Sequence, residues 1–143
     1  MRVFNEAGKK FKSVFYADSF GESENKTLAY YFASAFDKIY MQPTGRVTTT
    51  GFCLQTPFIK SFLDRWNIDF RVWAKEDYKT AFNMLTHDSF TQQHEEQLKW
   101  VLNGIFDQVT EGIAEGRGLT KLQVEQAISS APLTSHQSRE AGL

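Results

Sequence analysis

Residues 27–41, with the sequence TLAYYFASAFDKIYM, decide the fold of this chain. Residues 27–36 are rich in alanine and aromatic side chains and predict a helix that packs on several sides. Residues 38–41, KIYM, predict a short strand, and residues 43–45, PTG, predict the turn that ends it. A helix followed at once by a strand is the repeating element of an α/β domain.

The segments on either side extend this alternation. β-Branched and apolar residues predict strands at residues 13–18, 38–42, 46–52 and 69–74. A second helix is predicted over residues 56–66, because Thr56 has the side chain of an N-cap and Pro57 suits the first helical position. The order β-α-β-β-α-β predicts a layered α/β structure.

A long helix is predicted over about residues 90–115. Its apolar residues recur at steps of three and four, at Leu98, Val101, Leu102, Ile105, Phe106, Val109 and Ile113. Ser89 and Gln92 have the spacing of a capping box ahead of it. The glycines of residues 116–118, GRG, are expected to end it.

A shorter helix follows the long one. Thr120 and Gln123 have capping-box spacing, and we expect the helix to continue through Ile128. Pro132 cannot continue a helix and should separate it from the last residues.

Composition narrows the classes of function. The chain has 143 residues, which suits one domain, and its net charge of −1 argues against a nucleic-acid partner. It carries neither a stretch of about 20 apolar residues nor, in residues 1–12, the apolar segment of a signal peptide. Aromatic residues make up 15% of the chain, which suits a large core or a subunit interface.

The residues that most often bind metals or cofactors form no motif. His87, His94 and His136 are scattered, and His94 is expected to face solvent beside acidic neighbours. The one cysteine, Cys53, has apolar neighbours and is expected to be a small buried residue. Residues 21–27, GESENKT, lack the second glycine of a phosphate-binding loop and carry acidic residues that would repel phosphate. We therefore expect neither a metal nor a cofactor.

Lys79 differs from the other lysines by its surroundings. It follows a predicted strand and lies in DYKTAF, residues 77–82, with Tyr78 and Phe82 expected to shield its amine while Glu76 and Asp77 point to solvent. A shielded lysine amine loses its proton more readily and can then take the proton of a serine hydroxyl. The alternative, on the residue pattern alone, is an ordinary surface lysine whose amine reaches solvent.

The chain resembles the protease IV (signal peptide peptidase A) family of serine peptidases. The resemblance rests on six segments in one order: EAGKK (6–10) before SVFYADSF (13–20), AYYFASAFDKIY (29–40), QPTG (42–45) with TGF (50–52), VW (72–73) through YKTA (78–81), RGLT (117–120) and EAGL (140–143). Each segment alone is a weak signal, but their common order covers nearly the whole chain.

The resemblance implies an α/β fold of the crotonase/Clp-protease type and a Ser–Lys dyad. The family's catalytic lysine falls on Lys79 as general base, with Tyr78 and Thr80 as supporting neighbours. Its serine falls on Thr27, which is not expected to act, because the two glycines that follow the serine in the family are absent here. In long family members the lysine comes from an N-terminal repeat and the serine from a C-terminal one, and this chain resembles the lysine repeat.

The resemblance also implies a biological setting. Residues 1–143 are expected to form a single peptidase domain that is incomplete at both ends and inactive alone. The expected partners are a peptide substrate and a second repeat or homologous subunit that supplies the serine, in an oligomer. The assembled enzyme would degrade cleaved signal peptides at a bacterial inner membrane or a plastid membrane, held there by the full-length protein or by the assembly.

Two other functions remain open at this point. A catalytically inactive homologue could serve as an assembly or binding module, and the absence of the serine is compatible with it. An acyl-CoA hydratase of the related crotonase fold would need backbone amides in an oxyanion hole and a carboxylate base. The sequence carries no mark of either group.

Overall fold

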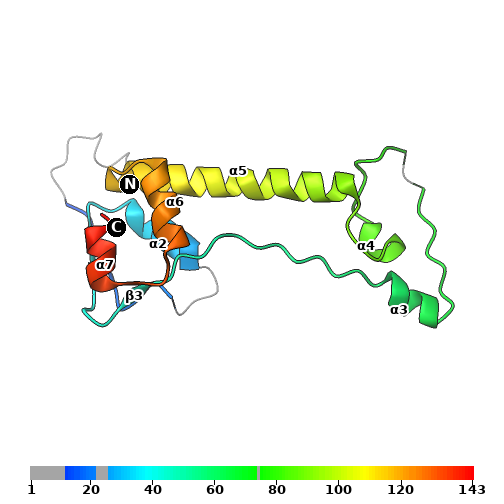
Figure 1. Cartoon of the computed structure of the whole chain (residues 1–143), viewed down its shortest axis with the longest axis horizontal. Helices are drawn as coiled ribbons and strands as arrows, with labels where there is room; N and C mark the ends of the chain where they lie inside the picture. Colours follow the sequence, from blue (N-terminus) through cyan, green and yellow to red (C-terminus); the bar gives the residue numbers. More distant parts are fainter. Residues whose placement is uncertain (1–11, 22–25, 74) are drawn as a thin grey trace. The chain divides into compact units, whose positions relative to one another are not determined.

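The computed structural model describes residues 12–21, 26–73 and 75–143. The chain divides into two compact units (Figure 1): unit 1 comprises residues 1–51 and 106–143, and unit 2 comprises residues 52–105. Residues 6–10, residues 22–25 and Ala74 lie outside the described residues. Helix α5 (Gln92–Arg117) begins in unit 2 and ends in unit 1.

Unit 1 contains the predicted β-α-β element. Strand β1 (Val14–Ala17) pairs in parallel with β2 (Lys38–Met41), and α2 (Lys26–Ser34) lies in the connection between them. The register places Val14 opposite Lys38 and Ala17 opposite Met41. These three predicted elements are confirmed, so the chain is a mixed α/β protein as predicted.

The third predicted strand is shorter than expected. Strand β3 is only Arg46–Val47, where residues 46–52 were predicted, and it pairs antiparallel with β4 (Leu133–Thr134). Strand β4 has only two residues and was not predicted. Because a strand extends only as far as its partner supplies hydrogen bonds, the two-residue β4 limits β3 as well.

The core of unit 1 lies between these strands and the helices. Tyr30, Val47, Ile113 and Val124 are each almost wholly buried. The ring of Phe20 stacks on Phe15 at 5.9 Å and meets the edge of Tyr30 at 5.1 Å. Residues far apart in sequence therefore form one aromatic and aliphatic core.

Helix α5 ends at Arg117, within the glycine-containing segment that was predicted to end it. Gly118 has a positive φ of 68°, a conformation that costs glycine little, and the Leu119 N–H donates to the Ala114 carbonyl at 2.9 Å. Helix α6 (Lys121–Ser129) begins with the predicted capping box of Thr120 and Gln123. A second capping box, formed by Thr134 and Gln137, begins α7 (Ser135–Glu140), which was not predicted.

Unit 2 corrects two predicted helix starts. Helix α3 is Lys60–Arg65 and begins after Ile59, not after Thr56, because the Ile59 N–H donates outside the helix to the Met84 carbonyl at 2.8 Å. Helix α5 begins at Gln92, and its cap is Thr91, whose hydroxyl accepts from the His94 N–H, so the capping box predicted from Ser89 is wrong. A short helix, α4 (Asn83–Thr86), was not predicted.

The strand predicted for residues 69–74 is also wrong. Residues 69–73 carry no regular secondary structure, and no strand among the described residues pairs with them. An extended segment becomes a strand only when a neighbour bonds its backbone groups. Among the described residues, no helix is both long enough and apolar enough to cross a membrane.

Candidate active site

Lys79 lies in unit 2, in the irregular segment between α3 and α4. Its backbone N–H closes a turn by donating to the Glu76 carbonyl at 3.1 Å. Its side chain lines a hollow of about 520 Å³ together with Val72, Trp73, Tyr78, Thr80, Ala81, Phe82 and Gln97. Lys79 therefore borders an open hollow on the surface of unit 2.

The first turns of α5 hold the backbone on both sides of Lys79. The Gln97 Nε2 donates to the Tyr78 carbonyl at 2.9 Å, and the Gln97 Oε1 accepts from the Thr80 hydroxyl at 2.7 Å. Next to it, Glu96 accepts from the Tyr78 hydroxyl at 3.0 Å. That hydrogen bond, and then the charge of Glu96, raise the pKa of Tyr78. Tyr78 and Thr80, the predicted supporting residues, are therefore both tied to α5.

The predicted shielding of Lys79 is wrong for this chain alone. Tyr78 and Phe82 have 54% and 52% of their surface exposed, and Lys79 is exposed as well. Glu76 and Asp77 are exposed, as predicted. The two rings cannot shield the amine, because no segment among the described residues of unit 2 packs over them fully.

Thr27, at the family's serine position, lies in α2 of unit 1. It is buried, and its hydroxyl donates to the Thr50 carbonyl. A hydroxyl whose proton is held by a backbone carbonyl has no base to activate it. The arrangement gives the Thr27 hydroxyl a structural contact.

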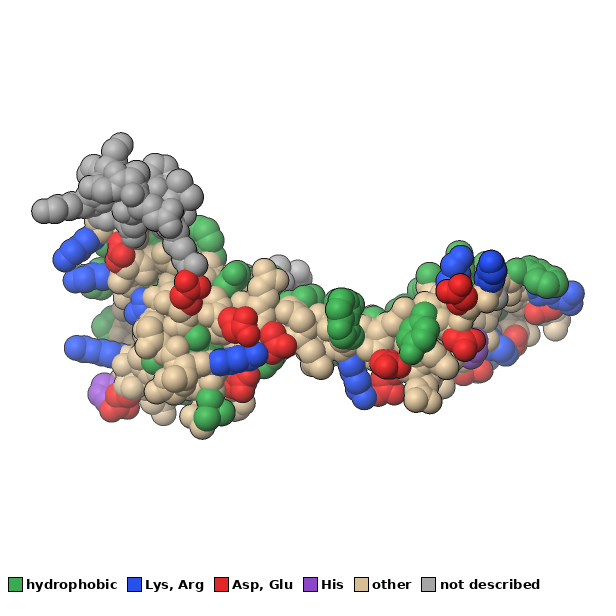
Figure 2. Space-filling model, turned by 90° about the horizontal axis from the view of Figure 1, so that it is seen from above, with side chains coloured by type: hydrophobic (Ala, Val, Ile, Leu, Met, Phe, Trp, Pro, Cys, Tyr) green, Lys and Arg blue, Asp and Glu red, His purple; other side chains and the backbone are tan. Residues whose placement is uncertain are grey.

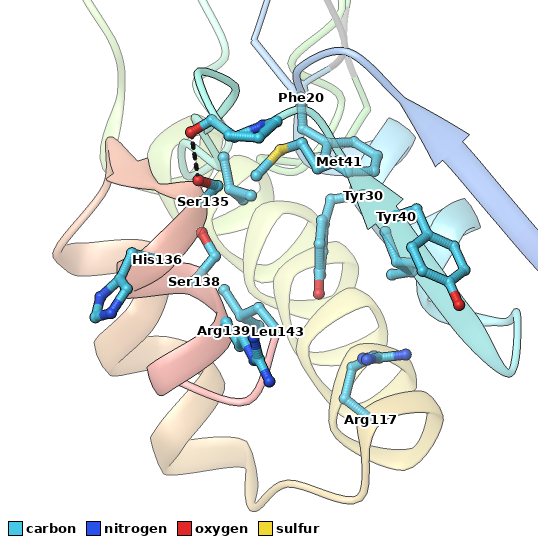
Figure 3. A pocket seen from close by; sticks show the side chains of 13 residues that line it. Phe20, Tyr30, Tyr40, Met41, Arg117, Ser135, His136, Ser138, Arg139 and Leu143 are labelled. Carbon is cyan, nitrogen blue, oxygen red and sulfur yellow. Dashed lines mark hydrogen bonds between the residues drawn. The ribbon is translucent and has the colours of Figure 1, made fainter.

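A larger hollow, of about 610 Å³, lies in unit 1 and contains neither Lys79 nor Thr27 (Figure 3). Arg117 and Arg139 line it together with Tyr30. The Tyr30 hydroxyl and the Arg117 Nε are buried, and neither has a hydrogen-bond partner among the described residues. Because neither residue that the sequence predicted for the Ser–Lys dyad lines this hollow, we do not place the active site there.

The histidines and the cysteine differ from expectation in two respects. His94 is 8% exposed and packs against the rings of Phe58 and Phe90, so its predicted exposure is wrong. Cys53 is exposed, so its predicted burial is wrong. Within the described part of the chain, no three His, Cys, Asp or Glu side chains gather in a way that could hold a metal ion.

Sequence reasoning missed Gln97 and Glu96. Both are polar residues of a helix that the sequence predicted correctly. Only the tertiary contact between this helix and residues 78–80 distinguishes them from the other polar residues of α5. No local spacing rule connects positions 17 to 19 residues apart.

Comparison with known proteins finds two relatives, and both are proteases. The chain is 24% identical over 114 residues to the chloroplastic serine protease SPPA of Arabidopsis thaliana, across 80% of this chain and 17% of that protein. It is 28% identical over 102 residues to Protease 4 of Salmonella typhi, across 71% of this chain and 15% of that protein. The chain thus spans about a sixth of the length of these relatives.

The family profile covers more of the chain than either relative. The profile of Peptidase family S49 matches residues 6–143, which include parts of both units and the segment around Lys79. The resemblance in the six sequence segments is therefore confirmed. The chain belongs to peptidase family S49.

Proposed function

We propose that this chain supplies the general-base lysine, Lys79, to a Ser–Lys dyad peptidase whose serine comes from outside the chain. The observation that carries the proposal is the YKTA segment, residues 78–81, in a chain that belongs to a serine peptidase family. The hollow of about 520 Å³ beside Lys79 supports it. A peptide is the substrate class that follows from the family.

The chemistry assigns one task to the lysine. The neutral Lys79 amine takes the proton of the serine hydroxyl as the serine oxygen attacks the peptide carbonyl. The lysine then passes that proton to the leaving amine, and water releases the acyl group from the serine in a second step. An amine can accept the proton only when it is uncharged, and exclusion of water favours the uncharged form.

Because the Lys79 amine must be shielded from water to stay uncharged, a partner that covers it is part of the proposal. Lys79 is exposed, and Trp73 in the same hollow is 99% exposed. The first half of α5 adds Trp100 at 78% and Val101 at 43%. Figure 2 shows hydrophobic side chains on the surface among charged ones. A second repeat or homologous subunit that covers these residues would bury the lysine and complete the oligomer.

The remaining parts of the proposal follow from the family and its members. We propose that the complete assembly has the crotonase/Clp-protease-like layered fold, in which residues 1–143 contribute one domain. It would degrade cleaved signal peptides at a membrane. The relatives, a chloroplastic and a bacterial protease, support a plastid or bacterial setting.

An inactive homologue that serves as an assembly module is the second candidate. The engaged hydroxyl of Thr27 and the exposure of Lys79 favour it. A fluorophosphonate probe separates the two functions. The chain alone should not be labelled, and the complete assembly should be labelled on the partner's serine. Labelling that disappears in a Lys79→Ala assembly supports the peptidase, whereas an assembly that is never labelled supports the inactive module.

A further inference from the structure

We propose that Gln97 is the positioning residue for Lys79, an inference that rests on the proposed role of Lys79 as general base. The segment that carries the lysine has no strand or helix to hold it. Its backbone hydrogen bonds close local turns only: the Lys79 N–H donates to the Glu76 carbonyl and the Asn83 N–H donates to the Thr80 carbonyl. The side chains of α5 must therefore fix where the lysine side chain begins.

The Gln97 amide can hold the lysine segment because it has a hydrogen-bond donor and a hydrogen-bond acceptor. Its NH₂ group donates to the Tyr78 carbonyl at 2.9 Å and its oxygen accepts from the Thr80 hydroxyl at 2.7 Å. These contacts hold the residues immediately before and after Lys79. The amide cannot be reversed, because its oxygen would then face the Tyr78 carbonyl oxygen, and neither can donate.

The Thr80–Gln97 hydrogen bond is partly buried, which favours a fixed geometry. Thr80 is only 9% exposed and Gln97 is half-buried, whereas Lys79 between Tyr78 and Thr80 is exposed. Leaving the buried Thr80 hydroxyl without a hydrogen-bond partner is unfavourable, so the Thr80–Gln97 hydrogen bond should stay formed. Helix α5, with 26 residues, provides a rigid base for it.

The residue type at position 97 matters for the same reason. A glutamate would keep the bond from Thr80 but would place a carboxylate oxygen against the Tyr78 carbonyl. A methionine of similar length would lose both bonds while preserving most of the volume. A misplaced base lowers the rate of the chemical step more than it lowers the affinity for substrate.

The test compares Gln97→Met and Thr80→Val in the complete peptidase. We expect each to lower kcat about tenfold or more with KM changed less than about twofold, since alignment is lost and binding is not. The double variant should be no slower than Gln97→Met, because the two residues share one bond. Thr80→Ser keeps the hydroxyl and should retain near-normal kcat. Gln93→Met, on the same helix one turn earlier, is the matched control, since the Gln93 side chain forms no hydrogen bond with the described residues.

Hydrogen exchange on the full chain gives a readout that does not depend on activity. Gln97→Met should speed exchange at the Lys79 amide while Gln93→Met leaves it unchanged. An inactive Lys79→Ala assembly together with a Gln97→Met assembly at wild-type kcat would overturn the positioning role alone. A fully active Lys79→Ala assembly would instead overturn the proposed function. Unchanged exchange at Lys79 in Gln97→Met would show that Gln97 does not hold the segment.

Discussion

The backbone of Gly116 in α5 lies directly against the backbone of Ser34 at the end of α2: a Cβ atom on Gly116 would be 2.3 Å from the Ser34 carbonyl oxygen. No flexible side chain can move to relieve that contact. Ser34 is itself buried, so the two helices cannot separate without opening the core of unit 1. Glycine at position 116 is therefore what permits these helices to pack.

The first prediction tests this contact. Gly116→Ala should lower the free energy of unfolding by about 2 kcal/mol, because the added methyl group forces the helices apart. Gly104→Ala in the same helix is the control, since nothing lies within 4 Å of its Cβ position. That change should raise helix stability by up to about 1 kcal/mol. Urea unfolding measures both, and equal effects of the two changes would contradict the account.

The second prediction concerns the buried Tyr30 hydroxyl, for which the described part of the chain supplies no hydrogen-bond partner. Tyr30→Phe removes an unpaired polar group and should raise the free energy of unfolding at pH 7 by about 1 kcal/mol. Burial raises the pKa of Tyr30 to about 12, whereas its ordinary value is 10.0. Above pH 10 the unfolded chain loses the proton first, so stability falls as the pH rises toward 12.

Between pH 7 and pH 11, the free energy of unfolding should fall less in Tyr30→Phe than in the wild type. Unfolding experiments at pH 7 and pH 11 measure it, and the advantage of the variant should be larger at pH 11. A variant less stable than the wild type at pH 7 would show that the hydroxyl has a partner that stabilises it.

The third prediction distinguishes the observed cap of α5 from the one expected from sequence. Thr91→Ala should cost about 1 kcal/mol, because it removes the acceptor of the His94 N–H. Ser89→Ala should cost much less, since Ser89 makes no capping hydrogen bond within the described residues, where Thr91 is the cap. Thermal unfolding of the two variants compares them, and a larger loss in Ser89→Ala would restore the sequence-based capping box.

The fourth prediction concerns the exposed tryptophan beside Lys79. Trp73 is 99% exposed, so Trp73→Ser should leave the unfolding of the chain nearly unchanged. If a second subunit covers this residue, the same change should weaken assembly by about tenfold or more, because buried tryptophans contribute strongly to interfaces. Sedimentation velocity across a concentration series measures the assembly. Identical association of the wild type and the variant would place the partner elsewhere.

Local signals in the sequence predicted the elements that depend on nearby residues. The apolar stripe from Leu98 to Ile113 predicted α5, and the Thr120 and Gln123 pair predicted the start of α6. Both signals lie within one or a few helical turns, and no distant contact is needed to interpret them. Strands β1 and β2 were predicted for a similar reason, since a helix links them directly.

The errors arose where distant residues decide the structure. Strand β3 ends early because its partner is a two-residue segment near the C-terminus, and residues 69–73 have no partner strand. The hydrogen bonds of Gln97 to Tyr78 and Thr80 depend on tertiary packing in the same way. Lys79 itself was identified by its resemblance to a family motif, because the residue pattern alone could not separate a catalytic lysine from a surface lysine.

The most direct test of the account is the turnover of a complete assembly that carries Lys79→Arg, measured on a hydrophobic peptide ester. A guanidinium keeps its proton and cannot act as base, so kcat should fall by about a thousandfold while the fold is retained. Lys75→Arg, four residues earlier and also exposed, should keep near-normal kcat and controls for the change of side chain. Near-normal turnover in Lys79→Arg would contradict the assignment of Lys79 as the catalytic base.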